Sequence, residues 1–437
     1  MSVLRVFTSR SVVEMLFQVT HGAVKGAVEI PASKSHTVRA VFFAGLAQGE
    51  SVIEAPLESR DTLAAVNCIR TLGASVKTEG GAWIVRGVGT PPPVPENVID
   101  VANSGTTLYI GLGVASLCDG YSVFTGDEQI RRRPVEPLLA SLRDLGAEAF
   151  ATKSNACPPA VIRGPLKGGQ TTIKVLTSQY VTSLLIAGAC AQKPVEIFVE
   201  NVLEQPYIEM TLAWLDSQGV QYEKENLSHF RFEGGARFKP FKRRMPGDFS
   251  SATFFLAAGA IAGGPVVLRG LDMRDTQGDK AVVDYLRAMG ARIELTPDGL
   301  AVSTGDLKGV QLDLNATPDA LPAMAVVACF ARGTTRLVNV PQARLKETDR
   351  ISVMAAELSK MGARVRELPD GLEVEGAGLV GTTVRGHGDH RVVMALAVAA
   401  LAAKGTTTIS EAEAVDVTFP NFAQLMKNIG ARLEEKN

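Results

Sequence analysis

One short signature recurs six times along the chain at nearly constant spacing. Its six occurrences are TLGASVK, DLGAEAF, DSQGVQY, AMGARIE, KMGARVR and NIGARLE, with Gly73, Gly146, Gly219, Gly290, Gly362 and Gly430. Successive glycines lie 68 to 73 residues apart. A repeat of this length is typical of one supersecondary unit used several times. The period therefore predicts six equivalent units.

The same internal pattern describes each unit. A helical pattern precedes every glycine and an alternating segment follows it, which fits a glycine that ends a helix before a strand. Two Asp-Gly pairs, in ARIELTPDGLAVSTG and ARVRELPDGLEVEG, predict β-hairpins. Each unit opens with a strand, a polar loop and a helix of small apolar residues that we expect to be buried. The predicted unit is βαβαββ.

Length and two prolines indicate how the units are grouped. A chain of 437 residues is longer than one hydrophobic core usually serves, so two domains are expected. Pro31 and Pro246 stand just before the first and fourth openings. We therefore predict an α/β fold with three units per domain. One domain is expected to span 33–246, and the other 1–32 plus 247–437.

Composition excludes several classes of function. Lys plus Arg number 45 and Asp plus Glu 46, so the formal charge of −1 gives no global attraction to nucleic acid or an acidic membrane. Five widely spaced cysteines, three of them in apolar segments, favour reduced thiols in a cytoplasmic protein over disulfides or a metal cluster. The start, MSVLRVFTSRSVVEMLFQV, fits an ordinary or slightly extended N-terminus, with a targeting remnant as the alternative.

Polar residues gather where the first helix of each unit begins. The six loops carry Lys34-Ser35, Asn103-Ser104-Gly105-Thr106, Thr177-Ser178-Gln179, Asp248, Asp319 and Asp389-His390-Arg391. Capping explains any one such loop. Six equivalent loops that also carry basic and amide side chains favour a convergence of helix N-termini on an anion. The pattern predicts a local site for a small, multiply anionic substrate, clamped by basic groups.

Charges also precede the second helices of several units, in GDEQIRRRPVEPLL, LEQPYIEMTL and RLKETDRISVM. Arg131 and Arg132 fit a solvated basic turn, whereas Arg133, followed by Pro134, is better placed to point into a site. In the stretch RLKETDRI, Arg344 and Asp349 fit structural roles at the helix start.

The motifs together resemble the enolpyruvyl transferase family, and within it the branch whose acceptor is shikimate 3-phosphate. They are PASKSHTVRA, ANSGTT, RRRPVEPL, TSQYVTSLL, QPYIEMT, PGDFSSATFFLAA, PDALPAMA, RLKETDR and GDHRVVMALA, from about residue 18 to the C-terminus. The resemblance implies two inside-out domains of three βαβαββ units, with the active site in the interdomain cleft. It implies transfer of the enolpyruvyl group of phosphoenolpyruvate to the 5-hydroxyl, with release of phosphate and no metal or organic cofactor. The implied protein is a cytoplasmic monomer with only these small-molecule partners.

The resemblance also assigns roles to individual residues. The shikimate 3-phosphate positions are Lys34, Ser35, Arg39, Thr177, Ser178, Gln179, Tyr207, Asp319, Gln342 and Lys346. The phosphoenolpyruvate positions are Lys34, Asn103, Gly105, Arg133, Gln179, Arg350, His390 and Arg391. Asp319 falls on the base for the attacking hydroxyl, and Glu347, helped by Lys34, on the group that handles the proton at the methylene carbon.

Some positions depart from the family pattern. Glu204 stands where a serine ordinarily touches the acceptor's phosphate, and Gln342 replaces a usual asparagine. Tyr109-Ile110 replaces Arg-Pro, which predicts altered sensitivity to glyphosate, and AVDVTFP lacks a common lysine. Three alternatives therefore stay open: transfer to UDP-N-acetylglucosamine, transfer to another and unphosphorylated hydroxyl acceptor, and a non-catalytic binding relative.

Overall fold

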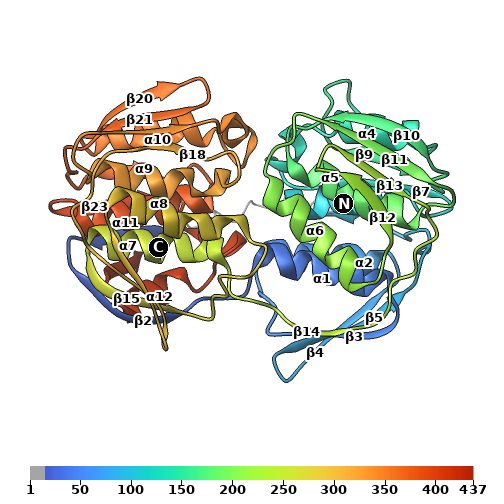
Figure 1. Cartoon of the computed structure of the whole chain (residues 1–437), viewed down its shortest axis with the longest axis horizontal. Helices are drawn as coiled ribbons and strands as arrows, with labels where there is room; N and C mark the ends of the chain where they lie inside the picture. Colours follow the sequence, from blue (N-terminus) through green and yellow to red (C-terminus); the bar gives the residue numbers. More distant parts are fainter. Residues whose placement is uncertain (1–14, 437) are drawn as a thin grey trace, which may run out of the picture.

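The computed structural model describes residues 15–436. Residues 1–14, for which the sequence predicts an ordinary or slightly extended N-terminus, lie outside the described residues, as does residue 437. The described chain forms two α/β domains side by side (Figure 1). This arrangement confirms the predicted fold class.

Each domain has its own hydrophobic core. One core takes its residues from between Val38 and Met245, and we name this body the central domain. The other core takes its residues from Phe17–Ile30 and from Ala252–Leu433, and we name it the terminal domain. Figure 1 shows the terminal domain on the left and the central domain on the right. The boundaries near residues 32 and 246 stay a prediction.

The strands between residues 15 and 436 form six four-stranded sheets, three in each domain. In the strand orders given next, the first two strands of every sheet run parallel to each other, and all other neighbouring strands are antiparallel. In the central domain the sheets are β14 (Lys242–Arg244), β3 (Gln48–Glu54), β5 (Ala82–Val88), β4 (Ser75–Glu79); β6 (Ile99–Asp100), β7 (Tyr121–Thr125), β9 (Ala160–Arg163), β8 (Glu148–Ala151); and β10 (Gly169–Lys174), β11 (Val195–Glu200), β13 (His229–Phe232), β12 (Tyr222–Glu225). In the terminal domain they are β2 (Val24–Glu29), β15 (Gly263–Arg269), β17 (Gly299–Ser303), β16 (Arg292–Thr296); β18 (Gln311–Asp313), β19 (Thr334–Val338), β21 (Gly371–Glu375), β20 (Arg364–Leu368); and β22 (Thr383–Arg385), β23 (Thr406–Ser410), β1 (Leu16–Thr20), β24 (Arg432–Lys436).

The helices follow the predicted alternation. The first helices of the units are α1 (Lys34–Leu46), α3 (Gly105–Ala115), α5 (Ser178–Cys190), α7 (Phe249–Ile261), α9 (Leu321–Cys329) and α11 (His390–Ala402). The second helices are α2 (Arg60–Thr71), α4 (Glu136–Asp144), α6 (Gln205–Ser217), α8 (Val282–Met289), α10 (Arg350–Lys360) and α12 (Phe422–Asn428). Short 3-10 turns are η1 (Ile130–Arg132), η2 (Gly278–Ala281), η3 (Pro318–Ala320), η4 (Pro341–Leu345) and η5 (Ala412–Val417). Among the described residues no helix has the length and hydropathy required to cross a membrane.

The first helices occupy the middle of each domain, with the sheets outside them. Nearly every residue of α7, α9 and α11 is buried, and these three helices contact one another. In the central domain, α3 contacts both α1 and α5. An apolar surface on all sides is stable only when other elements surround the helix. The prediction of buried first helices is confirmed, and it explains the inside-out arrangement.

The repeated glycines have one conformation. All six have φ between 72° and 104°, and each directly follows the end of a second helix or lies one residue beyond it. This left-handed region costs little for a residue without Cβ, so glycine reverses the chain from helix to strand at the same point of every unit.

The two predicted hairpins form, but their turns lie one residue earlier than Asp-Gly suggests. Thr296 pairs with Gly299 in one hairpin and Leu368 with Gly371 in the other, so each loop is a Pro-Asp pair. Proline presets the φ that the first loop position of a common turn requires. Each glycine is instead the first residue of the returning strand.

The opening strands of the first and fourth units are exchanged between domains. β2, which precedes α1, pairs with β15 in the terminal domain, and β14, which precedes α7, pairs with β3 in the central domain. Each of these two strands therefore lies in a different domain from the helix that follows it. The two crossing segments pair with each other: the Ser33 amide donates to Pro246 (2.7 Å), and the Asp248 amide donates to Pro31 (2.9 Å).

Candidate functional site

The charged loops of the two domains meet in the cleft between them. Arg133 of the central domain pairs with Glu347 of the terminal domain at 2.9 Å, and Lys346 pairs with Glu204 at 2.7 Å. These residues precede second helices, beside the N-termini of the first helices. The repeat thus brings together side chains that are far apart in the sequence, and their role as a convergent anion site stays a prediction.

Capping and site formation occur in the same loops. Ser33, Ser104, Thr177, Asp248 and Asp389 accept a backbone N–H at the start of α1, α3, α5, α7 and α11, respectively. In the unit that contains Asp319, η3 directly precedes α9, and neither has a side-chain cap. Because a cap fixes where a helix begins, these residues set the positions of the neighbouring Lys34, Gly105, Ser178 and Arg391.

Arg350, the first residue of α10, is the centre of the charge cluster. Its guanidinium donates to Asp389 (2.8 Å), Asp319 (2.7 Å) and Glu347 (2.5 Å). The side chain is 1% exposed. Burial alone would lower the pKa of Arg350, but the three carboxylates raise it above its ordinary value. Arg350 is therefore a permanent buried cation, and its carboxylate partners balance its charge.

Asp319 lies between several cations. Its second oxygen is 3.0 Å from Arg391, and Lys346 is 3.8 Å away. Burial would raise the pKa of Asp319, but Arg391, Lys346 and Arg350 hold it well below its usual range. The carboxylate is therefore ionised, as a general base must be, although these cations must be redistributed before it can accept a proton.

Glu347 bridges the domains through Arg133 and Arg350. Burial would raise its pKa, but the two guanidiniums lower it well below the ordinary value. Arg133 itself lies against Gly105: a Cβ added to that glycine would stand 2.2 Å from Nη1 of the arginine. Close approach of this guanidinium to α3 therefore requires glycine at position 105.

Lys34 and His390 complete this end of the cleft. Lys34 is 3.2 Å from Asp61. Burial raises the pKa of Asp61 above its ordinary value, although the nearby lysine acts to lower it. His390 is buried, and neither ring nitrogen has a hydrogen-bond partner among residues 15–436. Burial holds the pKa of His390 well below its ordinary value, so the ring is neutral. An unpartnered buried ring beside Glu347 is suited to contact a substrate.

The other end of the cleft is formed by the loop before α5. The Ser178 amide and hydroxyl donate to Glu204 at 2.9 and 2.6 Å, and the Thr177 hydroxyl donates to the same oxygen at 3.2 Å. A cavity of about 20 Å³ beside this loop is lined by residues that include Arg133, Thr177 and Lys346. Gln179 and Gln342 also line it, and each has a buried Oε1 with no hydrogen-bond partner within the described chain.

Other predicted site residues have hydrogen-bond partners within the protein. Arg39 is buried and donates to Thr211, Thr182 and two backbone carbonyls, and desolvation lowers its pKa to about 10. One of these carbonyls belongs to Ser35. The Tyr207 hydroxyl donates to Asp279 across the domain interface at 2.8 Å. The Asn103 amide donates to Asp127 and Gln129, so its side chain is engaged at the rim.

Sequence reasoning missed three acidic members of the cluster as site residues, Asp61, Glu204 and Asp279, and named Asp389 only as part of a polar loop, with no role of its own. Glu204 was recognised only as a departure from the family pattern. Asp61 and Asp279 lie at the starts of the second helices of their units, as Glu347 and Arg350 do. Alignment of the units to one another could therefore have found them, whereas Asp389 has the sequence pattern of an ordinary cap.

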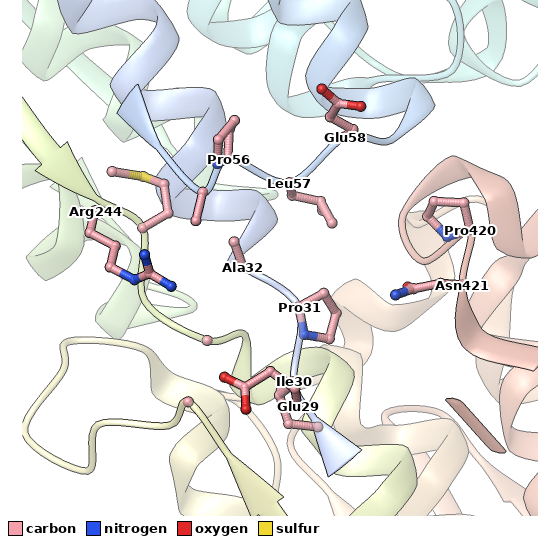
Figure 2. Close-up of a pocket in the computed structure, with 14 residues that line it drawn as sticks. Glu29, Ile30, Pro31, Ala32, Pro56, Leu57, Glu58, Arg244, Pro420 and Asn421 are labelled. Carbon is pink, nitrogen blue, oxygen red and sulfur yellow. The ribbon is translucent and has the colours of Figure 1, made fainter. Parts of the chain in front are cut away.

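A separate cavity of about 460 Å³ lies beside the domain crossings. Figure 2 shows Pro31 and Ala32 on the crossing segment, with Glu58 and Glu29 on opposite sides of the cavity. Arg244 contributes a basic side chain, and Pro420 and Asn421 close another side. The described residues of this cavity lack the convergent charge pairs of the cleft, so we place the candidate active site in the cleft.

Comparisons with known proteins agree with this fold. Residues 19–426 match the family described as EPSP synthase (3-phosphoshikimate 1-carboxyvinyltransferase). A relative of that name from Acetivibrio thermocellus is 51% identical, covering 95% of this chain and 99% of the relative. Another from Ruminiclostridium cellulolyticum is 49% identical, covering 96% and 100%.

A solved structure of EPSP synthase from Acinetobacter baumannii superposes with a TM-score of 0.80, at 29% identity, covering 97% of this chain and 100% of that one. A second solved structure, from the same organism, has a TM-score of 0.79 at 28% identity. The resemblance identified from the motifs is confirmed: this chain belongs to the EPSP synthase family of transferases.

Proposed function

We propose that this protein transfers the enolpyruvyl group of phosphoenolpyruvate to the 5-hydroxyl of shikimate 3-phosphate and releases phosphate. The supporting observation is the cleft itself, where the cations Lys34, Arg133, Lys346, Arg350 and Arg391 surround the carboxylates of Asp319 and Glu347. A chain of net charge −1 places these cations at one interface, where two small anionic substrates can be bound.

In this proposal the substrates replace internal ion pairs. The carboxylate and phosphate of phosphoenolpyruvate engage Arg133, Arg350 and Arg391, which in the structure pair with Glu347 and Asp319. Each carboxylate then loses counter-charges, so its pKa rises from a strongly lowered value toward the range useful for proton transfer. Substrate binding therefore activates both groups.

The chemistry needs two proton transfers in opposite senses. The 5-hydroxyl oxygen bonds to C2 of phosphoenolpyruvate while Asp319 takes its proton, and Glu347, with Lys34, delivers a proton to C3. Elimination removes a proton from C3, breaks the C2–O bond to phosphate and restores the double bond. The arginines orient both substrates and stabilise the developing charge.

Phosphate release is the direct test. Phosphoenolpyruvate should release phosphate only when shikimate 3-phosphate is present. The same assay with shikimate or UDP-N-acetylglucosamine as the sole acceptor tests the two catalytic alternatives, and activity with either alone would contradict the assignment. One observation favours an unphosphorylated acceptor as the second candidate: Glu204 already holds the Thr177–Ser178 loop. Absence of turnover with all three would favour a non-catalytic binding relative.

The proposal extends to cellular context and inhibition. The reaction would serve the shikimate pathway to chorismate and aromatic amino acids, in the cytoplasm and as a monomer. Tyr109 and Tyr180 both donate a hydroxyl to the Pro134 carbonyl, which ties α3 and α5 to the residue after Arg133. We propose that this contact changes glyphosate sensitivity at the phosphoenolpyruvate site. An inhibition constant typical of sensitive enzymes would contradict that part.

A further inference from the structure

We propose that Glu204 is an internal competitor of the acceptor's phosphate. Its carboxylate occupies the anion site at the N-terminus of α5, and a phosphate monoester must displace it to bind. The inference rests on the proposed function, because it names what the acceptor competes with in that same site. It makes Glu204 a specificity-determining residue for the phosphorylated end of the acceptor.

The contacts of Glu204 are those of a bound anion. One oxygen accepts the Ser178 amide (2.9 Å), the Ser178 hydroxyl (2.6 Å) and the Thr177 hydroxyl (3.2 Å). The other accepts the Lys346 ammonium at 2.7 Å. Two hydroxyls, a helix N-terminal amide and a cation are the donors that proteins use to hold phosphate. Glu204 is 1% exposed, so solvent does not compete for these donors.

Because Glu204 makes these contacts, its side chain does not cap α6, the helix that it precedes. It is the residue before α6, but its side chain makes no capping hydrogen bond there. Its backbone lies in the left-handed region, with φ 51° and ψ 44°, where residues with a side chain are uncommon. The side chain of an ordinary capping residue would accept a backbone N–H from the first turn of α6. The chain instead directs this carboxylate to the N-terminus of α5 and to Lys346 of the other domain.

The site has no room for two anions. The adjoining cavity of about 20 Å³ has space for roughly one water molecule, whereas a phosphate group is several times larger. A phosphate dianion beside a buried carboxylate would also be repelled. Acceptor binding must therefore move Glu204 out of the site and transfer Lys346 from the carboxylate to the phosphate.

The need to displace Glu204 affects two acceptors differently when they differ only in the phosphate group. Shikimate 3-phosphate must break the Glu204 contacts, which weakens its binding. Shikimate leaves Glu204 in place, so the affinity for shikimate does not depend on the Glu204 carboxylate. A serine at this position, as the family ordinarily has, would leave the donors and Lys346 available to phosphate.

Titration calorimetry on the full chain tests the inference with Glu204→Ser and Glu204→Gln. Both substitutions should strengthen the binding of shikimate 3-phosphate at least tenfold and lower its KM by a similar factor, while the binding of shikimate changes less than threefold. Glu209→Gln is the matched control, because Glu209 is an exposed glutamate on α6, the helix that directly follows Glu204. That variant should bind shikimate 3-phosphate as the unsubstituted protein does.

Circular dichroism and the thermal midpoint establish that each variant is folded. If both folded Glu204 variants bind shikimate 3-phosphate equally or more weakly than the unsubstituted protein, the inference is wrong. Equal gains for shikimate and shikimate 3-phosphate would overturn it too, because the effect would then not concern phosphate. Failure of the proposed function is a separate result, seen as absent phosphate release by the unsubstituted protein, and the binding comparison still decides the role of Glu204.

Discussion

At the scale of single residues, buried carboxyl groups determine how the cleft responds to pH. Asp279 is 3% exposed and one of its oxygens accepts the Tyr207 hydroxyl. Burial and the nearby Asp319 raise the pKa of Asp279 to about 6. A carboxyl that binds its proton more tightly in the folded state opposes folding once it ionises. The penalty grows between about pH 4 and pH 6 and is complete above that range.

Asp279→Asn should therefore raise the free energy of unfolding at pH 7.5 by about 1–3 kcal/mol. The asparagine oxygen can still accept the Tyr207 hydroxyl, and the gain should shrink toward zero near pH 4. Chemical denaturation at both pH values measures this difference. Asp284→Asn, at an exposed position on α8, is the control and should change stability little. A loss of stability at pH 7.5 would contradict the prediction.

Gly105 imposes a steric condition on phosphoenolpyruvate binding. A Cβ at this position would stand 2.2 Å from Nη1 of Arg133, so the guanidinium must shift in Gly105→Ala. A small misplacement of a binding group weakens both substrate affinity and rate. We expect KM for phosphoenolpyruvate to rise at least tenfold with little change in the thermal midpoint. Steady-state kinetics with each substrate varied checks this, and an unchanged KM for phosphoenolpyruvate would show that the prediction is wrong.

At the scale of elements, the N-terminus of α10 couples stability to the site. Asp349 accepts the amides of Ile351 and Ser352 at 3.1 Å each and pairs with Arg344 at 2.7 Å. Arg344 also pairs with Glu367 at 2.8 Å. These contacts agree with the structural roles predicted for Arg344 and Asp349. They fix the helix start, where Arg350 begins.

Asp349→Ala should lower the free energy of unfolding by about 1–2 kcal/mol, because two amides lose their acceptor. It should also reduce kcat/KM, since Arg350 is the first residue of the helix. Asp349→Asn keeps one capping oxygen and is the matched control, with smaller losses in both quantities. Urea denaturation and steady-state kinetics provide the measurements. Equal losses in the two variants would show that charge, rather than the cap, is the important property.

At the scale of the whole molecule, ion pairs join the two domains across the cleft. Glu347 pairs with Arg133 at 2.9 Å across the cleft, and both side chains are largely buried. Removing one partner of a buried pair costs about 3–5 kcal/mol, which shifts a two-state equilibrium about a hundredfold or more. The contact between the two domains should therefore depend on this carboxylate.

Glu347→Gln should open the cleft in the absence of substrate, because a neutral amide cannot balance Arg133. Small-angle X-ray scattering should then give a larger radius of gyration than for the unsubstituted protein. Glu367→Gln removes an exposed carboxylate within the terminal domain and should leave the radius unchanged. A Glu347→Gln protein as compact as the unsubstituted one would exclude Glu347 as the closing contact.

Local chemistry in the sequence was sufficient to predict the unit and its order. Glycine is favoured in the left-handed conformation, so Gly73 and its five equivalents mark the ends of helices wherever the fold places them. Apolar residues around a whole helix require burial, as in α7, which predicts that the first helices of the units are buried. The sequence also predicted charged residues at the helix starts, Arg350 among them, because helix N-termini have recognisable sequence patterns.

Only the tertiary structure decided which residues become partners. The predicted bounds already assign β2 and β14 to different domains, but their pairing with β15 and β3 depends on contacts between segments far apart in the chain, because a strand has the same local pattern in any sheet. The positions of Glu204 and Asp279 depend on the other domain, which supplies Lys346 and Tyr207, respectively. Hydrogen bonds and ion pairs act over a few ångströms in space, whatever the separation along the chain. The sequence by itself therefore determined the elements and the kinds of charge, and the folded contacts determined what each charge does.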